Sequence, residues 1–428
     1  VFWPLFKALS LPKRLASCVS QLPSQSTFGI GRVILLVVVH LLLGYRRMQH
    51  IEFYEEDPLV ARILGLRKLP TTSTLSRTLA KADRSSVEAI RTLSRDLVLE
   101  RLSIEQFGRI TLDFDGSVQS TTRYAEGSAV GFNKKKKGAR SYYPLFATIA
   151  QTGQFLDMRH RSGNVHDSNG ADELMRTSIQ SLRQHSARSL LETRIDSAFF
   201  GQKLLFLLDE ELDVEFTCSV PFERLTELRH IIDDATNWST IDEDWAFFEQ
   251  TWRPESWPRS MRFVFVRQRV KVQRKGPLQL DLFDPSDRTY QYTVIATNKS
   301  EQAPTVIEFH HGRGGQEKIL GEAKQNAALD VIVGKRRVVN ELWTWSGILA
   351  HNLSRELEMR ASTPRPFDDA KRSPRWHFES LGTLRQTLLH RAGRLVKPER
   401  RLTLVMNQNR AVVGRMRYYM GEDLRLAG

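Results

Sequence analysis

The stretch Phe107–Ser120, FGRITLDFDGSVQS, is the part of the sequence that most directly indicates the fold. Apolar and polar residues alternate along it, which predicts a β-strand with one buried face. Because successive strand side chains point to opposite faces, Asp113 and Asp115 lie on the same side near the strand end. Two like charges about 4 Å apart repel by roughly 4 kcal/mol at an effective dielectric constant of about 20. A divalent cation would relieve that cost.

The segments that follow this strand predict an α/β fold. Residues 141–153 and 154–165 are rich in β-branched and aromatic residues and are separated by a Thr-Gly turn signal. Residues 167–185 have a helical pattern, residues 189–200 form another apolar strand, and residues 201–212 are helical again. This order predicts a mixed sheet covered by helices.

The region before the first strand is expected to be helical. Its most apolar run, Val33–Leu43, has 11 residues, which is too short to span a bilayer, and it predicts a buried helix. Further on, Thr72 or Ser73 can cap a basic helix, and Ser85 or Ser86 can cap a second one. Two such helices predict either a DNA-binding bundle or a purely structural helical cap.

The chain divides into five predicted segments, and the middle one is unusual in composition. Four of the eight tryptophans and two long alternating stretches occur between residues 223 and 300, which predicts an all-β insertion. The segments are an N-terminal helical domain with a predicted DNA-binding role (1–103), the first part of a catalytic core (104–222), the insertion (223–300), the second part of the core (301–361) and a basic C-terminal extension (362–428).

The overall charge favours a polyanionic partner. The chain has 428 residues with 63 Lys and Arg against 49 Asp and Glu, a formal net charge of +14. Basic surfaces gain affinity for nucleic acids by neutralising phosphates and releasing counterions. A membrane surface is the competing polyanion, but no basic amphipathic helix stands out. Only Cys18 and Cys218 are present, so the sequence predicts neither a disulfide framework nor a cysteine zinc site and favours a reducing compartment.

Two further acidic residues complete a candidate site. Asp196 follows an apolar strand, as Asp115 does. The stretch 307–324, IEFHHGRGGQEKILGEAK, places Arg313, Glu317 and Lys324 on one face if it is helical. That face is either a solvated charged surface or part of a site. Carboxylates at the ends of neighbouring strands with one from a helix suit Mg²⁺ or Mn²⁺ and two-metal phosphodiester chemistry.

Together these motifs resemble the DDE transposases of bacterial insertion sequences, which have a ribonuclease-H-like core. In one large group the last motif is tyrosine, two residues, arginine, three residues, glutamate, six residues and lysine. Arg313, Glu317 and Lys324 match that spacing, whereas His310 stands at the tyrosine position. The stretches DFDGS, RSGNVHD, RIDSAFF and TNKS are also in keeping with the group catalogued as transposase DDE domain, group 1.

The resemblance implies roles for individual residues. Asp115, Asp196 and Glu317 correspond to the catalytic triad that binds two Mg²⁺ ions, for which Mn²⁺ can substitute, and Asp113 is the alternative to Asp115. Arg313 and Lys324 would contact DNA phosphates, and His310 would do so in place of the tyrosine or have no role. The basic run Lys134, Lys135, Lys136 and Lys137 is either a solvated loop or a DNA contact. One of Trp238, Trp245, Trp252 and Trp257 would stack on a flipped base, although core packing is the usual fate of a tryptophan.

The expected function is therefore DNA transposition. The resemblance implies an enzyme that binds the terminal inverted repeats of its element, cuts double-stranded DNA with metal ions and joins the ends to target DNA. It implies a homodimer in the synaptic complex and a cytoplasmic, nucleoid-associated protein without a membrane partner. Two alternatives stay open: a ribonuclease-H-like nuclease without strand transfer, and a decayed copy that binds inverted repeats but does not cut.

Overall fold

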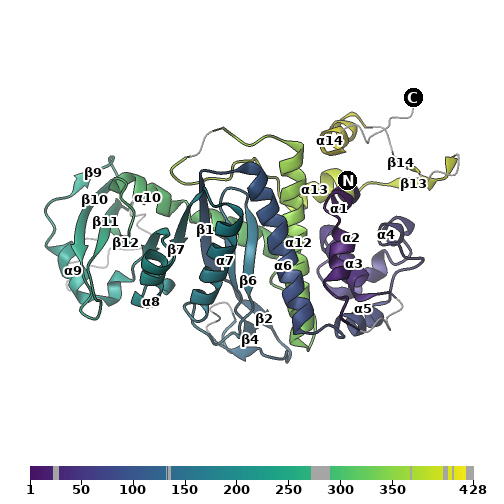
Figure 1. The fold of residues 1–428 in the computed structure, drawn as a ribbon, viewed down its shortest axis with the longest axis horizontal. Helices are drawn as coiled ribbons and strands as arrows, with labels where there is room; N and C mark the ends of the chain where they lie inside the picture. Colours follow the sequence, from purple (N-terminus) through teal and green to yellow (C-terminus); the bar gives the residue numbers. More distant parts are fainter. Residues whose placement is uncertain are drawn as a thin grey trace, which may run out of the picture.

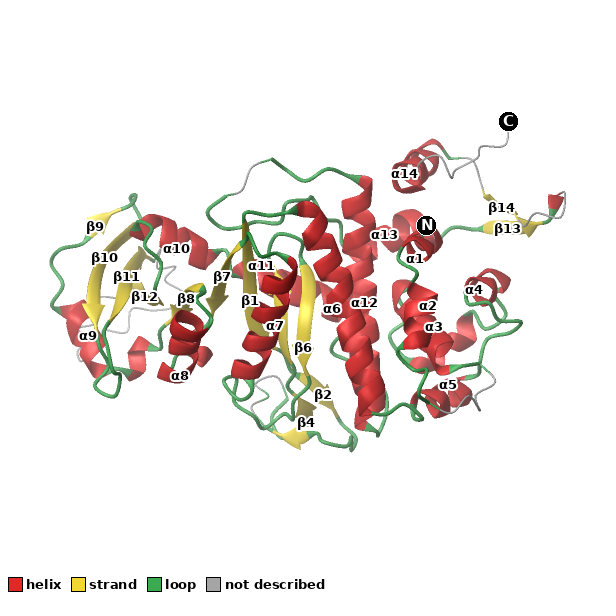
Figure 2. Cartoon of the chain, in the orientation of Figure 1, coloured by secondary structure: helices red, strands yellow, loops and turns green. Residues whose placement is uncertain are grey.

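A nine-stranded mixed sheet runs through the middle of the molecule and carries helices on both faces (Figures 1 and 2). The structure is a computed structural model and describes residues 1–22, 28–131, 133, 136–270, 290–366, 369–398, 403–406 and 409–420. The strand order is β6-β5-β1-β7-β8-β12-β11-β10-β9. The predicted mixed α/β fold is confirmed.

Five strands form the part of the sheet that carries the predicted site. They are β1 (Arg109–Gly116), β5 (Leu145–Ile149), β6 (Gln154–Arg159), β7 (Leu190–Ile195) and β8 (Glu215–Ser219). β1 pairs antiparallel with β5, and β5 pairs antiparallel with β6. On its other side β1 pairs parallel with β7, and β7 pairs parallel with β8. β1, β6, β7 and β8 therefore run in the same direction, and their carboxyl ends lie at the same end of the sheet.

The alternation along β1 separates an apolar face from a polar one. Ile110, Leu112 and Phe114 are fully buried in a core that includes residues of α7 (Ala171–His185) and α8 (Gln202–Phe206). Thr111 and Asp113 point to the opposite face, where α11 (Gly314–Ala327) and α12 (Arg337–Ala361) belong to a second core. The chain continues from α8 into one turn of π-helix, Leu207–Glu211.

The predicted insertion lengthens the same sheet. Its strands are β9 (Ser239–Thr240), β10 (Trp245–Trp252), β11 (Met261–Arg269) and β12 (Tyr290–Thr297), and β12 pairs with β8. Phe248 of β10 stacks on Phe265 of β11 with ring centroids 4.5 Å apart. The segment is not entirely β, because α9 (Thr226–Asp233) precedes the strands and buries Leu228 and Ile232, one turn apart.

The N-terminal region is helical, as predicted, and packs on the core through α6 and α12. In α3 all residues but Arg32 are buried, which confirms the predicted buried helix. The cap of α5 is Thr71 and the cap of α6 is Asp83, one to three residues before the predicted caps. The helices are α1 (Phe2–Ala8), α2 (Leu11–Ser17), α3 (Ile30–Leu42), α4 (Pro58–Ile63), α5 (Thr72–Leu79) and α6 (Arg84–Glu105), with a 3₁₀ turn at Met48–Phe53.

The remaining elements lie at the periphery. A small sheet of β2 (Gln119–Thr121), β4 (Arg140–Tyr142) and β3 (Ala129–Val130) follows β1. The C-terminal part has α13 (Leu381–Leu384), a π-turn (Arg385–Leu389), a hairpin of β13 (Gly393–Val396) and β14 (Thr403–Met406), and α14 (Arg410–Met420). The structure also has 3₁₀ turns at Ser197–Phe199 and Phe222–Arg224. No helix within the described ranges is long and apolar enough to cross a membrane. The boundaries of the five predicted segments stay a prediction.

Candidate active site

The parallel pairing of β1 with β7 brings Asp115 and Asp196 together. Asp113 lies opposite Arg194 in the register of these strands, and continuing that register by two residues places Asp115 beside Asp196. Asp115 is the penultimate residue of β1, and Asp196 follows the last residue of β7, where its carboxylate accepts a hydrogen bond from the Ala198 amide at 3.0 Å. The two carboxylates expected from the sequence therefore meet at one edge of the sheet.

Asp113, the alternative to Asp115, has a different environment. Its side chain is 1% exposed, and both of its oxygens accept hydrogen bonds from Arg194, each at 2.6 Å. Arg194 also donates to the backbone carbonyls of Phe309 and Lys371, at 3.3 and 2.6 Å. Asp113 is thus the compensated partner of a buried ion pair, whereas Asp115 faces another carboxylate.

The carboxylates of Asp115 and Asp196 repel each other in a largely buried environment. Burial and the neighbouring charge of Asp196 raise the pKa of Asp115 to about 7, against the opposing effect of Arg313. Burial likewise raises the pKa of Asp196, and Arg313 again opposes the shift. Two partly buried carboxylates with one nearby cation retain an unmet demand for positive charge.

The predicted helix across residues 307–324 is divided into two helices. α10 (Ala303–His311) ends at Gly312 and α11 begins at Gly314. A Cβ atom at Gly312 would lie 2.1 Å from both the Arg194 guanidinium and the Lys371 carbonyl oxygen, so only glycine fits where the helices join. Gln316, fully buried, donates to the backbone carbonyl of Asp113 at 2.7 Å and fixes α11 against β1.

Glu317 lies apart from the aspartate pair. Its side chain is 65% exposed, and Oε1 is 3.5 Å from Nη2 of Arg313, one turn earlier. Within the described residues, no three acidic, histidine or cysteine side chains converge closely enough to hold a metal ion. The structure therefore brings together two members of the expected triad, whereas the third, Glu317, contacts Arg313. Arg313 in turn lowers the pKa of Asp115 and of Asp196.

His310 differs from the expectation that it contacts phosphate. The ring is buried, with Nδ1 2.9 Å from the Thr217 hydroxyl and Nε2 2.8 Å from the Ser219 hydroxyl. Burial, with Arg313 nearby, lowers the pKa of His310 to about 3. The neutral ring joins α10 to β8 and offers no free nitrogen to a DNA phosphate in this structure. Helical spacing alone cannot distinguish the buried face from the exposed one here.

The other predicted DNA contacts are partly described. Lys136 and Lys137 are exposed, whereas Lys134 and Lys135 lie outside the described residues. Lys324 is half-buried on α11, and Arg313 is 20% exposed. Trp257 is buried against Phe200 and Phe206, and the other three insertion tryptophans are half-buried with ring contacts, which makes each of them a packing residue in this structure. These contacts are Trp238 with Phe248, Trp245 with His311 and Trp252 with Phe263.

A third carboxylate, Asp167, lies beside the pair and was not singled out from the sequence. A Cβ atom at Gly116 would lie 2.5 Å from Asp167 Oδ1, so the glycine after Asp115 makes room for this side chain. Asp167 raises the pKa of both Asp115 and Asp196. Its Oδ1 is buried without a hydrogen-bond partner among the described residues. The available signal was that the RSGNVHD loop follows β6, whose carboxyl end shares the edge with β1 and β7.

Arg161 and Tyr143 hold the loop that carries Asp167. Arg161 donates to the backbone carbonyls of Tyr143, His166, Asp167 and Asn169 at 2.8 to 3.2 Å. Burial and the carboxylate of Asp167 raise the pKa of the Tyr143 hydroxyl. The loop is therefore fixed by its own buried arginine at the edge where the aspartates meet.

These residues fit a divalent metal ion in their chemistry. Asp115, Asp196 and Asp167 carry hard oxygen donors, which Mg²⁺ and Mn²⁺ prefer, and Oδ1 of Asp167 is 3.8 Å from Nη2 of Arg161 without a hydrogen bond. The raised pKa of Asp115 to about 7 has the origin expected of a cation site without its cation, namely burial beside like charge.

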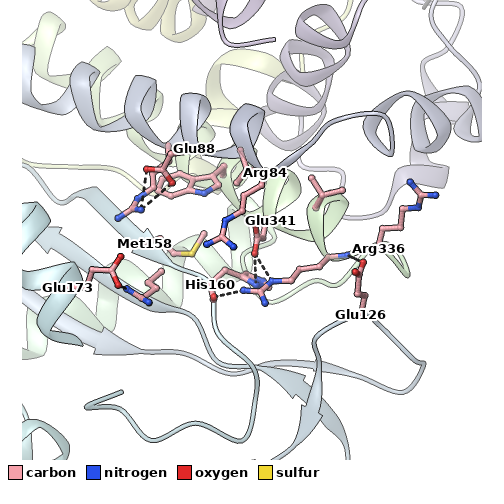
Figure 3. A pocket seen from close by; sticks show the side chains of 14 residues that line it. Arg84, Glu88, Glu126, Met158, His160, Glu173, Arg336 and Glu341 are labelled. Atoms are coloured by element: carbon pink, nitrogen blue, oxygen red, sulfur yellow. Dashed lines mark hydrogen bonds and ion pairs between the residues drawn. The ribbon is translucent and has the colours of Figure 1, made fainter. Parts of the chain in front are cut away.

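A separate cavity of about 670 Å³ lies between the N-terminal helices and the core (Figure 3). Its arginines are largely neutralised: Arg337 pairs with Glu341 at 2.7 Å, Arg159 pairs with Glu173, and Arg91 pairs with Asp157 at 2.6 Å. Figure 3 shows Glu341 between His160 and the arginine side chains. These ion pairs join α6 and α7 to β6, the Arg337 pair lies within α12, and none of them includes the aspartate pair.

Carboxylates brought together at the ends of adjacent parallel strands are the kind of oxygen donors that two-metal phosphodiester chemistry uses. The profile of the family described as "Transposase DDE domain group 1" matches residues 4–424, and the chain belongs to this family. Membership makes it a transposase, a nucleotidyl-transfer enzyme of a class that uses divalent metal.

Two solved structures are similar to parts of this chain. A cryo-EM structure of a piggyBac transposase synaptic complex with hairpin DNA is 11% identical, with a TM-score of 0.45 over 82% of this chain and 72% of that one. The Mos1 transposase paired-end complex with left transposon end is 9% identical, with a TM-score of 0.19 over 39% and 56% of the respective chains. A search of curated proteins found no match.

Proposed function

We propose that this protein is a cut-and-paste DNA transposase that binds the terminal inverted repeats of its element, hydrolyses phosphodiester bonds at the ends and joins them to target DNA. The observation that carries the proposal is the meeting of Asp115 and Asp196 at the ends of β1 and β7, with the pKa of Asp115 raised to about 7. Repulsion within such a pair lowers the stability of the fold, and such carboxylates can hold the metal ions of phosphoryl transfer.

Asp115 and Asp196 would hold the metal ions, and Asp167 is a further oxygen donor within the same cluster. Bound Mg²⁺ or Mn²⁺ ions supply activation of the attacking oxygen and stabilisation of the leaving oxygen. Glu317 would complete the donor set by turning away from Arg313, and its 65% exposure leaves the side chain free to change rotamer. Arg313 would then be released to a DNA phosphate, for which a guanidinium offers bidentate hydrogen bonds.

DNA contacts outside the carboxylate cluster would come from basic residues. Lys324 follows Arg313 and Glu317 on α11, and Lys134, Lys135, Lys136 and Lys137 follow β3. The net charge of +14 supports a large electrostatic contribution to DNA affinity. Bringing two element ends together implies at least a homodimer in the synaptic complex.

A second function, DNA binding without cleavage, is favoured by two observations. Glu317 is separated from the aspartates by its pairing with Arg313, and His310, at the position of the family's tyrosine, is buried. A protein that holds inverted repeats but does not cut them would show both features. A nuclease without strand transfer is the third possibility and differs only in its products.

Cleavage of a plasmid that carries both element ends with their flanking DNA distinguishes these functions. With Mn²⁺ or Mg²⁺, the wild-type protein should cut at the ends and produce joined products. Asp196→Asn and Glu317→Gln should abolish cutting while DNA retention persists. Cutting without joined products would favour the nuclease, and no metal-dependent cutting by the wild type would favour the binding protein.

A further inference from the structure

A second cleft, of about 550 Å³, lies along α11 and has a strongly basic lining. It is bounded by the first turns of α11, by Asp113 of β1, and by Arg365 and residues between 371 and 378 after α12. Its cationic residues are Arg194, Lys318, Arg355, Arg365, Lys371 and Arg372, against only Asp113 and Glu322 among its acidic residues. The lining therefore carries a surplus of positive charge.

Half of these cations are already neutralised within the fold. Arg194 pairs with Asp113, Arg355 pairs with Glu322, and Arg372 donates to Glu192 at 2.7 Å. These residues form the buried floor and walls of the cleft. The Arg355 side chain is only 5% exposed, and its buried Nε has no hydrogen-bond partner in the described part of the chain.

The other cations have no carboxylate within ion-pair distance among the described residues. Lys318 and Lys371 are exposed, and Arg365 is exposed with only a 3.5 Å contact to Nδ1 of His377. They approach the cleft from two sides, Lys318 from α11 and the others from the segment after α12. Three cations without a carboxylate at ion-pair distance among the described residues lie around one concave surface, where they repel one another. Asp369 offsets only part of the charge of Lys371.

The cleft lies along a different edge of α11 from the catalytic residues. At about 100° per residue, Arg313, Glu317 and Lys324 occupy one stripe of the helix, and Gln316 faces β1. Gly314, Gly315, Lys318 and Glu322, which line the cleft, form another stripe. Nothing lies within 4 Å of a Cβ atom placed at Gly314 or Gly315, so this surface is open to a ligand. The positive end of the α11 dipole adds to the basic charge there.

We propose that this cleft binds a phosphodiester of the DNA backbone, so that α11 contacts DNA along two edges, the catalytic edge and the Lys318 edge. The inference rests on the proposed function, because it takes DNA as the polyanion. The phosphate belongs either to the element end being cut or to the target duplex, and both present the same chemistry. By contrast, the cavity in Figure 3 is lined by five arginines and four glutamates, and Arg91, Arg159 and Arg337 form ion pairs with carboxylates.

The test is the salt dependence of DNA binding by Lys318→Ala/Lys371→Ala, with Arg188→Ala as the control. Arg188 is exposed before the first residue of β7, at the opposite end of the sheet from the aspartates. Two probes are used: a labelled duplex with the element end and its flank, and a labelled duplex of unrelated sequence offered as target to protein loaded with pre-cut ends.

Each phosphate contact that is lost should reduce the slope of log K against log[salt] by about 0.9, so the double variant should lose about 1 to 2 units. A reduction with the first probe assigns the phosphate to the element end, and a reduction with the second alone assigns it to the target. Lys318→Arg/Lys371→Arg should restore the wild-type slope. Unchanged slopes with both probes, or an equal loss in Arg188→Ala, would overturn the inference.

This experiment separates failure of the inference from failure of the proposed function. Binding slopes do not require cutting, and cutting of the end-bearing plasmid by the wild type is scored separately. Because Lys318 and Lys371 are exposed and unpaired with described carboxylates, their removal should leave the thermal unfolding midpoint unchanged. A wild type that binds but does not cut would contradict the proposed function and leave the slope measurement valid.

Discussion

Two pairs of residues at β1 and β7 differ in how their buried charges are compensated. Asp113 of β1 pairs with Arg194 of β7, and the carboxylate receives two hydrogen bonds of 2.6 Å. Two residues further along the same face, Asp115 meets Asp196, and burial with like charge raises the pKa of Asp115 to about 7. The first pair is compensated inside the fold by opposite charge, whereas the carboxylates of the second have no ion-pair partner of their own and are stabilised only by Arg313, His166 and backbone amides nearby.

We interpret the first pair as structural and propose the second as the functional one. The ion pair also holds the ends of other segments, because Arg194 donates to Phe309 of α10 and to Lys371 of the segment after α12. The ion pair positions α10 and α11 against the sheet. The aspartate pair lies near Arg313, where α10 ends and α11 begins. A carboxylate whose pKa is raised by burial beside like charge is a candidate functional group.

The largest expected effect is on catalysis. Asp115→Asn and Asp196→Asn should each reduce cleavage of end-bearing DNA by at least about 100-fold, because each removes a charged oxygen donor from the reaction centre. The assay is plasmid cleavage with Mn²⁺, with DNA retention measured in parallel. Full cleavage by either variant would remove the aspartate pair from the mechanism.

The next effect is on stability, at the compensated pair. Arg194→Met should lower the free energy of unfolding by about 3–5 kcal/mol, because it leaves the carboxylate of Asp113 buried and unpaired. Urea denaturation measures the change. The double variant Asp113→Leu/Arg194→Met should recover part of the loss, since no buried charge then remains. A double variant less stable than the single one would contradict this reasoning.

Replacement of His310 should have a smaller structural cost. His310→Leu should destabilise the protein by about 1–3 kcal/mol, because the hydroxyls of Thr217 and Ser219 lose their partner. The pKa of His310, near 3, keeps the ring neutral above about pH 5. Cleavage by the wild type should therefore show no inflection from His310 between about pH 5 and about pH 8, and an inflection that His310→Leu abolishes would contradict the assignment.

Removing the charge of Asp115 should stabilise the metal-free protein in a pH-dependent way. Its pKa is about 7 in the fold against an ordinary value of 3.8, so the folded state binds more protons between those values. Stability should consequently fall as pH rises through that window. Asp115→Asn should gain up to about 4 kcal/mol over wild type at about pH 8 and less at about pH 5, measured by urea denaturation with EDTA. A gain independent of pH would argue against the shifted pKa.

The smallest effect on stability is expected at Glu317. Its side chain is mostly exposed and contacts Arg313 at 3.5 Å, so Glu317→Gln should leave the unfolding midpoint unchanged. Thermal unfolding checks this. A marked destabilisation would show that Glu317 supports the fold and would weaken its assignment as a mobile donor.

Periodicity in the sequence predicted much of the fold. The period of two along Phe107–Ser120 gave β1 with Asp113 and Asp115 on one face, and the buried helix at Val33–Leu43 followed from its unbroken apolar run. Strand order could be anticipated only as a mixed sheet. That β12 joins β8, and makes the insertion part of the same sheet, depends on pairing between distant segments that local patterns do not contain.

The site was harder to predict from the sequence, because the role of each charged residue depends on which distant side chains it contacts. Asp113 and Asp115 look alike in the strand pattern, and only the position of Arg194 distinguishes them. His310 has the spacing of a site residue, but the hydroxyls of Thr217 and Ser219 make it a buried link between elements. Asp167 lies in a loop without periodicity and reaches the aspartates only because residue 116 is glycine.

Mn²⁺ binding measured by electron paramagnetic resonance tests the central claim most directly, since it reports the aspartate pair without requiring DNA or turnover. The account predicts that the wild-type protein binds Mn²⁺, more tightly as pH rises through about 7, and that Asp115→Asn loses this binding while Arg188→Ala keeps it. Wild-type Mn²⁺ affinity in Asp115→Asn would contradict the assignment of Asp115 and Asp196 as the metal site.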